Sequence, residues 1–244
     1  MPEQLWFTEL LNRYLHGFVT SFLEAIHIHP RYPQAPISNF VAMEVLVFCI
    51  LIAFFILIRM NLSVDRPRAL QHTAEFIGEF VAGQCKDVIG HGSEIYVPYI
   101  ATIGLFILAS NLIGLIPGFE SPTASPAVPL GCALCTFAYY HFHGFRKQGP
   151  LHYAKHFLGP VWWMSPLMLP IELVGHLARV LSLTIRLFAN IFAGDIITMV
   201  FFSMIPIGFP VIFLGLHIAV SLLQTYIFML LTLAYVSVAV AEEH

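Results

Sequence analysis

The sequence predicts an all-α membrane protein with about five membrane segments and one cytoplasmic amphipathic helix. Three observations support this fold class. Hydrophobic residues make up 58% of the 244 residues and charged residues only 10%, against about 45–50% and 25% in globular domains. The mean hydropathy is +0.81. Several apolar runs also reach the roughly 20 residues that a helix needs to cross a bilayer.

Five apolar runs are the predicted segments, and they cover residues 40–58, 95–116, 127–143, 166–205 and 211–240. The third run is the shortest. The fourth would form a helix of about 60 Å, twice the roughly 30 Å of hydrocarbon, so it must kink, for example near Pro170, or tilt strongly. The segment "PIGFP" (206–210) then reverses the chain. The last two segments are therefore predicted to form a long, strongly tilted hairpin.

Lysine and arginine residues mark the cytoplasmic side of the membrane. They gather between the first two segments and after the third, at Arg59, Arg66, Arg68, Lys86, Arg146, Lys147 and Lys155. The loop 117–126 has none. We therefore expect an external N-terminus and a cytoplasmic C-terminus.

The connections between the segments complete the predicted architecture. Apolar residues recur at helical spacing after the first segment, at Leu70, Ala74, Ile77, Val81 and Val88. This pattern is typical of an amphipathic helix on the cytoplasmic face. The proline-rich stretch 117–129 is predicted to be an external loop. The whole chain is expected to be one multi-pass membrane domain, with an external region (1–39), three spans with cytoplasmic segments (40–160) and the long hairpin (161–244).

Composition also argues against several classes of function. A net charge of −3 lacks the basic footprint of a nucleic-acid-binding protein. Cys132 and Cys135 form a CxxC pair inside an apolar run without a second pair, which favours packing over a metal or redox site. We expect no metal and no cofactor.

The fourth segment carries a narrow stripe of polar residues. On a helical wheel, the stripe spans about 80° and holds Glu172, His176, Arg179, Arg186 and Asn190. Asp195 falls on another side of the wheel. An ionisable group at the centre of a span costs about 2.5–3.5 kcal/mol on insertion scales, and such groups usually face protein or water along an ion pathway.

The two arginines differ in their available partners. Glu172 is seven residues before Arg179, so a structural ion pair is one interpretation of Arg179. Arg186 has no carboxylate closer than Glu172 on its own face, fourteen residues away. Since an arginine keeps its proton in almost any environment, Arg186 is predicted to act as a fixed positive charge and not as a proton relay.

The last segment adds polar groups, among them His217 and Gln224, which are seven residues apart and nearly on one face. His217 and Asp195 belong to the half nearer the 206–210 turn, whereas Glu172 and His176 lie near the cytoplasmic end. Arg186 comes between the two groups. This order predicts titratable groups reached from each side of the membrane, although helix–helix hydrogen bonding remains an alternative role for both histidines.

Three motifs resemble subunit a of the F-type ATP synthases. They are "LSLTIRLFANIFAGD" (181–195), "SNLIGLIPGF" (110–119) and the C-terminal stretch 222–244. Two residues depart from the family pattern, since Asp195 stands where many members have glutamate and Ala189 replaces a common glycine. The segment 125–131 also lacks an asparagine-rich pattern often seen there.

The resemblance implies a stator subunit, without catalytic chemistry of its own, beside a rotating ring of small hairpin c subunits. It also implies peripheral-stalk b subunits as partners and the inner membrane of a bacterium as the location. Arg186 takes the place of the family's essential arginine. The residues that match the lining of the two proton half-channels are Glu172, Asn190, Asp195, His217 and Gln224.

Three other functions are alternatives to this one. A stand-alone ion transporter or channel would favour inverted repeats and broken helices at matched positions, and the sequence has no obvious repeat. A haem-binding membrane cytochrome would use His176 and His217 as axial ligands, one histidine from each helix. A voltage sensor would need arginines at every third position, but here two occur seven apart.

Overall fold

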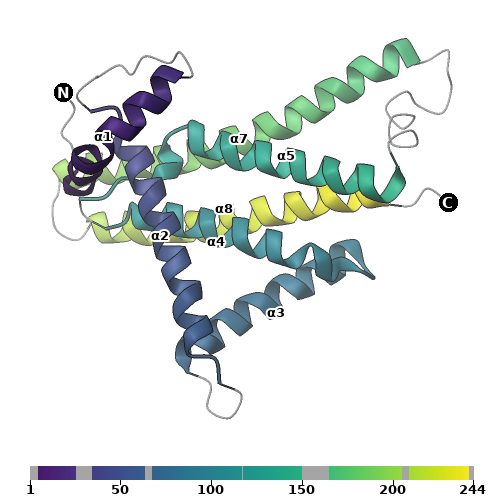
Figure 1. Cartoon of the computed structure of the whole chain (residues 1–244), viewed down its shortest axis with the longest axis horizontal. Coiled ribbons are helices and arrows are strands. Elements are labelled where there is room, and N and C mark those ends of the chain that lie inside the picture. The colour runs from purple at the N-terminus through teal and green to yellow at the C-terminus, as the bar shows by residue number, and fades with distance from the viewer. Residues whose placement is uncertain are drawn as a thin grey trace.

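A computed structural model of the chain describes residues 5–25, 35–63, 68–116, 118–149, 165–204 and 209–241. The described residues form helices and connecting turns, and no strand occurs among them (Figure 1). The all-α membrane fold is therefore confirmed. Most of the predicted 206–210 turn, together with Arg66 and Lys155, lies outside the described residues.

The helices follow the predicted order, with one addition at the N-terminus. They are α1 (Trp6–Ala25), α2 (Asn39–Met60), α3 (Ala69–Ile89), α4 (Val97–Ile113), α5 (Ala127–Gln148), α7 (Ser165–Met204) and α8 (Phe209–Val240), with short 3-10 helices at Ser93–Ile95 and Pro122–Ala124. Four stretches are long and apolar enough to cross a membrane: Asn39–Met60, Ser93–Ile113, Leu167–Met204 and Val211–Val240.

Helix α5 corresponds to the third predicted segment. It has 22 residues, which is enough to cross a bilayer. It is not one of the four stretches that are also apolar enough to do so. Its second half carries His141, His143, Arg146 and Lys147. This polar end explains why the apolar run stops at about residue 143.

The long hairpin has the predicted form. Helix α7 is continuous over 40 residues with Pro170 inside it, and α8 is continuous over 32 residues. The two helices pack against each other more extensively than any other pair, and α5 contacts both. In Figure 1 they run together at one end of the molecule and diverge towards the other. Their inclination to a bilayer stays a prediction.

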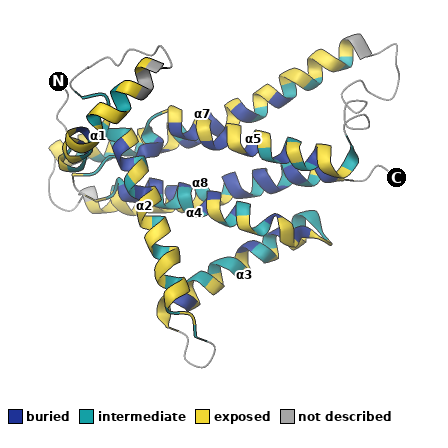
Figure 2. Cartoon of the chain, in the orientation of Figure 1, coloured by how far each residue is buried: buried dark blue, intermediate teal, exposed yellow. Residues whose placement is uncertain are grey.

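The packed core lies where α4, α5, α7 and α8 meet, as the dark blue ribbon in Figure 2 shows. Leu187 and Ile191 of α7 are completely buried there, with Phe228 of α8 and Ile107 of α4. The outward sides of α2 and α7 carry exposed apolar residues. Because lipid tails are as apolar as these side chains, close packing and interhelical hydrogen bonds hold such a bundle together more than the hydrophobic effect does.

The predicted amphipathic helix is α3, and it packs against α4 and α8. Val81 and Cys85 are buried on its inward face. Leu70, which was placed on the same face, is 47% exposed instead. The buried residue in that first turn is Gln71, which accepts a hydrogen bond from the Ser63 amide and donates one to Glu75. Gln71, and not Leu70, therefore occupies the inward position in this turn of α3.

Helix α1 was not predicted within the external N-terminal region 1–39. Asn12 joins it to the start of α2, because its amide group donates to the carbonyl oxygen of Ile37 at 3.1 Å and accepts from the amide of Ile37 at 3.0 Å. Apolar residues four apart, such as Leu10, Tyr14 and Phe18, were the available helix signal.

Candidate functional site

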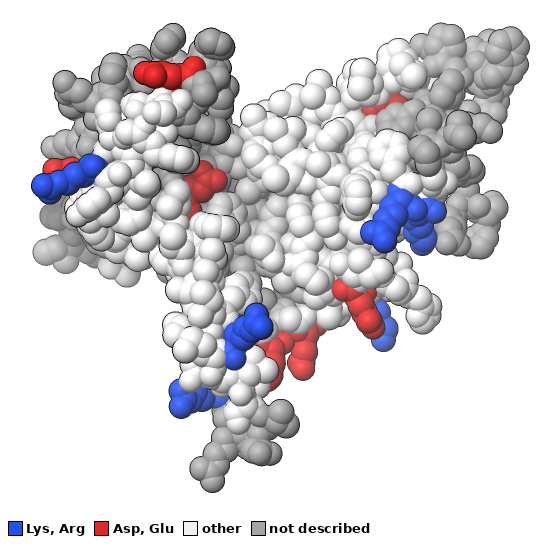
Figure 3. All heavy atoms as spheres, viewed as in Figure 1, with Lys and Arg blue, Asp and Glu red and all other residues white. Residues whose placement is uncertain are grey.

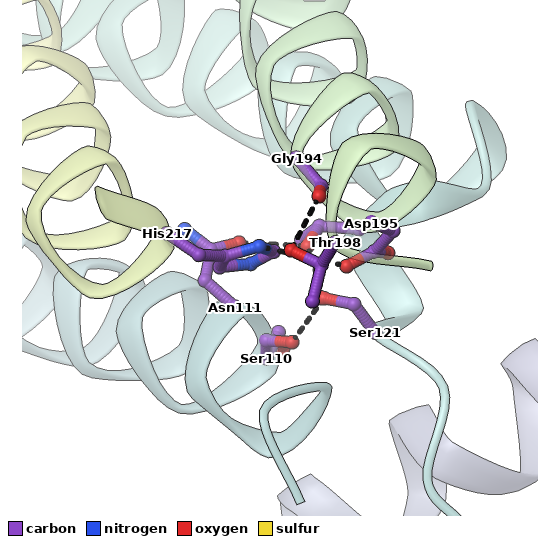
Figure 4. A network of polar contacts seen from close by, with 8 residues as sticks. Ser110, Asn111, Ser121, Gly194, Asp195, Thr198 and His217 are labelled. Carbon is purple, nitrogen blue, oxygen red and sulfur yellow. Dashed lines mark hydrogen bonds and ion pairs between the residues drawn. The ribbon is translucent and has the colours of Figure 1, made fainter. Parts of the chain in front are cut away.

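Asp195 of α7 and His217 of α8 come together at the end of the bundle near the α7–α8 connection (Figure 4). Asp195 Oδ1 lies 3.7 Å from His217 Nδ1, and the histidine is buried. This distance is too long for a hydrogen bond, but it allows strong attraction when the imidazole is protonated. The structure therefore brings together the two residues that the sequence assigned to the outer half.

Gly194 makes this approach possible. A Cβ atom at position 194 would lie 2.9 Å from His217 Nδ1, well inside the contact distance of a carbon and a nitrogen atom. A larger residue at position 194 would have to displace the histidine ring away from Asp195. The glycine of the "AGD" motif thus has a packing function in this pair.

The connection between α4 and α5, which was predicted to be an external loop, contributes to the same region, and sequence reasoning missed this contribution. Ser121 donates a hydrogen bond to the carbonyl oxygen of Ser110 at 2.8 Å, and Thr123 donates to Asn111 Oδ1 at 2.7 Å. The 3-10 helix Pro122–Ala124 also packs against α7. Figure 4 shows Ser110, Asn111 and Ser121 gathered beside the Asp195–His217 pair. The loop therefore folds back into the bundle and lines this end of the site.

Asn190 and Gln224 connect α7 and α8 deeper in the bundle. The amide nitrogen of Asn190 donates to Gln224 Oε1 at 2.9 Å. Gln224 is almost completely buried. Since Asn190 lies one helical turn beyond Arg186, this contact joins the outer residues to the arginine.

A row of polar atoms lies between the outer pair and Gln224. Several buried atoms among the described residues have no hydrogen-bond partner in the protein, and those near this route are Ser110 Oγ, Asn111 Nδ2, His217 Nε2, Ser221 Oγ and Gln224 Nε2. His217, Ser221 and Gln224 follow one another on one face of α8. Buried polar groups without a protein partner are sites where water binds, so this row can hold a hydrated path.

Arg186 is half-buried, and among the described residues its polar contact is from Nη2 to Ser182 Oγ at 2.9 Å. Within the described part of the chain no carboxylate forms an ion pair with it. Along α7, Glu172 is about 21 Å away and Asp195 about 13 Å at 1.5 Å per residue. The predicted unpaired cation is thus present between the two groups.

Arg179 does not pair with Glu172, which was one interpretation of the sequence. Its guanidinium carbon lies 5.3 Å from the ring centroid of Tyr235 on α8. Glu172 Oε1 instead lies 3.3 Å from His176 Nε2. The reason is helical geometry, since residues four apart are neighbours on a helix surface, whereas residues seven apart are separated by two turns.

A second polar group lies nearer the start of α7, far from Asp195. His176 is buried, and its Nδ1 lies 2.8 Å from the hydroxyl of Tyr140 on α5. The ring of His141 lies 4.8 Å from that of His176. Sequence reasoning missed Tyr140, whose only signal was a hydroxyl within an apolar run.

The two predicted haem ligands cannot serve one haem. His217 lies against Gly194, and His176 is eighteen residues earlier on the same continuous helix. This separation corresponds to about 27 Å, far more than a single iron atom can bridge. The geometry therefore argues against the cytochrome alternative.

Comparison with known proteins identifies the family. The family model of the ATP synthase A chain matches residues 41–237. The chain is 58% identical over 244 residues to ATP synthase subunit a of Koribacter versatilis (strain Ellin345), covering 100% of both chains. It is 51% identical over 213 residues to ATP synthase subunit a of Solibacter usitatus (strain Ellin6076), covering 87% of this chain and 91% of the relative. The polar residues described above thus lie within a matched region, and the chain belongs to the ATP synthase subunit a family.

Proposed function

We propose that this member of the ATP synthase subunit a family is a stator that forms two aqueous half-channels, which pass protons to and from carboxylates on a rotating ring of small hairpin c subunits. Arg186 carries this proposal, because it is a permanent cation without a carboxylate partner among the described residues. It lies between two separate groups of titratable side chains. The chain itself performs no covalent chemistry in this mechanism.

The outer half-channel runs past Asp195 and His217 to the Asn190–Gln224 pair. Both ends of this route support the proposal, since a titratable pair stands at the entrance and a partly buried amide contact lies one turn from Arg186. The unpaired polar atoms between them can order water. A proton that follows this route neutralises a ring carboxylate, which then moves through lipid at low cost.

The inner half-channel begins near Glu172. Glu172 is partly exposed, with 32% of its side chain accessible, and its contact with His176 fixes the carboxylate. Tyr140 in turn holds the imidazole of His176. A ring carboxyl group that arrives here loses its proton towards the cytoplasm.

The surface around Arg186 fits a partner helix. Ser182 and Ala189 lie about one turn from Arg186 on α7, Ala193 lies two turns away, and all three are exposed. Small residues let membrane helices approach closely. Apolar residues such as Leu181 and Ile185 are exposed beside them. We place the ring on this side of α7, and we assign peripheral-stalk b subunits as further partners in the complex.

The proposed orientation has the N-terminus outside and the C-terminus in the cytoplasm of a bacterium, with the chain in the inner membrane. The bias of lysine and arginine supports it. We expect a cysteine engineered at position 242 to react with a membrane-impermeant maleimide in inverted vesicles and not in intact cells. If the cysteine reacted only in intact cells, the orientation would be the opposite of the one proposed.

The two half-channels are tested by silver-ion accessibility. The native cysteines Cys49, Cys85, Cys132 and Cys135 are first replaced by alanine, and single cysteines are then introduced at positions 195 and 172. We expect silver ions to protect position 195 from later alkylation only when added outside, and position 172 only when added inside. Mass spectrometry of the alkylated peptides gives the result without requiring an active enzyme.

A cysteine at position 187 is the matched control, because Leu187 is completely buried on the packed face of the same helix. It is expected to resist silver ions from both sides. Protection of positions 195 and 172 from one and the same side would contradict the two-channel proposal.

A further inference from the structure

Helix α1 carries a row of large apolar side chains on its outward side. The row consists of Trp6, Leu10, Tyr14 and Phe18, which are 62%, 44%, 78% and 74% exposed. Residues four apart are neighbours on a helix surface, so these four side chains form one continuous ridge along α1. A contiguous exposed apolar surface of this kind marks a site of interaction with another protein or with a membrane.

The opposite side of α1 faces the rest of the protein. Thr8 and Asn12 are buried, and on a helical wheel they lie about 160° from the middle of the ridge. Asn12 forms two hydrogen bonds with the backbone of Ile37, and the amide of Leu5 donates to Asn39 Oδ1 at 3.4 Å. Helix α1 is therefore held at the start of α2 with its ridge turned outward.

A third side of α1, next to the ridge, is polar. Glu9 and Arg13 are exposed and lie about 80–120° from the middle of the ridge. On the face that Figure 3 shows, the described surface of this helix is mostly white, with charged side chains at its margins. A helix with one apolar and one polar side lies at the surface of a bilayer, with its apolar residues buried at the boundary of headgroups and acyl chains.

The attachment to α2 sets the level of α1 in a membrane. Because α2 is long and apolar enough to cross a bilayer, its first residues lie near one membrane surface. Val41, Val45 and Phe48 are exposed in the first turns of α2, and Figure 2 shows exposed residues on both α1 and the adjoining part of α2. Tryptophan and tyrosine, here Trp6 and Tyr14, are enriched at this level, where an apolar ring is buried and its polar group reaches water.

We propose that α1 is an interfacial anchor, which binds the lipid surface of the leaflet in which α2 begins. The partner is the bilayer itself, and the apolar ridge is the surface that contacts it. Glu9 and Arg13 carry opposite charges, so the polar side of the helix does not by itself favour an anionic lipid. Phosphatidylcholine, which has no net charge, is therefore sufficient as the partner.

The anchor is connected to the Asp195–His217 end of the bundle. Asn39, which accepts the hydrogen bond from Leu5, donates another to Glu120 Oε1 at 3.2 Å. Glu120 belongs to the connection between α4 and α5 that lies beside this pair. A helix α1 held in the lipid surface thus keeps this connection at the membrane surface. Binding to lipid requires no proton transfer, so its test is independent of the half-channel proposal.

The test uses the purified complex in phosphatidylcholine nanodiscs, with the four cysteines of this subunit replaced by alanine. The variants Leu10→Cys, on the ridge, and Glu9→Cys, on the polar side, are matched because they are neighbours on the same helix. Each is labelled with a nitrobenzoxadiazole fluorophore, and the signal of the complex without an introduced cysteine is subtracted. We expect a phosphatidylcholine with a nitroxide on its acyl chain to quench the label of Leu10→Cys, and aqueous iodide to quench that of Glu9→Cys.

Tyr14→Cys provides a second position on the ridge, should the Leu10→Cys variant assemble poorly. Three results would overturn the proposal. Quenching of the ridge label by iodide and not by the nitroxide lipid would show that the ridge faces water. Protection of this label from both quenchers would show that another protein covers it. Equal quenching of the ridge and Glu9→Cys labels by the nitroxide lipid would place the whole helix within the hydrocarbon.

Discussion

Replacing Arg186 by alanine is expected to abolish ATP-driven proton pumping in inverted membrane vesicles. The substitution removes a fixed positive charge that lies between the two groups of titratable residues on α7 and has no carboxylate partner among the described residues. At an effective dielectric constant near 20, two unit charges 4 Å apart interact by about 4 kcal/mol. Without that attraction a ring carboxyl group keeps its proton as it passes, and without the repulsion a proton crosses directly. With the catalytic head removed, we therefore also expect a passive proton leak.

Arg179→Ala is the matched control, since it removes the same type of side chain from the same helix. Arg179 lies over the ring of Tyr235, a contact of about 0.5–1 kcal/mol at exposed sites. We expect this variant to keep most of its pumping. Arg186→Lys should not restore full coupling, because an ammonium group lacks the planar fork and loses its proton more readily when desolvated.

Normal pumping by the Arg186→Ala variant, with the protein present at its usual level in the membrane, would disprove the proposed mechanism. Equal loss in the Arg179→Ala variant would instead indicate that Arg179 is required as well, so that the effect is not specific to position 186.

Replacing Asp195 by asparagine is expected to lower proton pumping at least about tenfold. Asparagine has the same size and still forms hydrogen bonds, but it cannot take up and release a proton. Positioned groups that transfer protons contribute roughly 10²–10⁴-fold to the rate of proton-transfer steps in enzymes. The deprotonated partner 3.7 Å from His217 is lost in this variant. Initial rates of quenching of a pH-sensitive dye in inverted vesicles measure the effect.

Two further variants separate titration from packing. Asp195→Glu keeps the carboxylate with one more methylene group, so we expect pumping within about twofold of the unmodified complex. Glu120→Gln removes a nearby carboxylate that accepts a hydrogen bond from Asn39 and is expected to have a small effect. An Asp195→Asn variant that pumps normally would remove Asp195 from the proton route.

The sequence was sufficient for the features that depend on one helix at a time. Apolar runs located α2, α4, α7 and α8, because the length of such a run decides whether a helix can cross the hydrocarbon. The helical period located the polar stripe on α7 and the amphipathic face of α3. The spacing in the sequence also gave the distances along the helix axis from Arg186 to Asp195 and to Glu172. These distances hold in the structure because α7 is continuous.

The contacts between helices required the tertiary structure. The sequence assigned Asp195 and His217 to the same half of the membrane, but their 3.7 Å approach depends on how α7 and α8 pack at Gly194. The sequence suggested Glu172 as a partner for Arg179, whereas the packing of α8 places the ring of Tyr235 beside its guanidinium group. The inward fold of the 117–129 loop and the contact of Tyr140 with His176 were decided in the same way.

The physical reason is that a sequence pattern describes the local geometry of one helix, whereas contacts between helices depend on residues far apart in the chain. A helical period specifies the angle and the depth of each side chain on its own helix, because both follow from local backbone geometry. It does not specify which face of a neighbouring helix lies opposite, since that depends on small residues, side-chain shapes and polar pairs far apart in the chain. The positions of the charges in this subunit were therefore determined by its sequence, whereas their partners were decided only when the helices packed together.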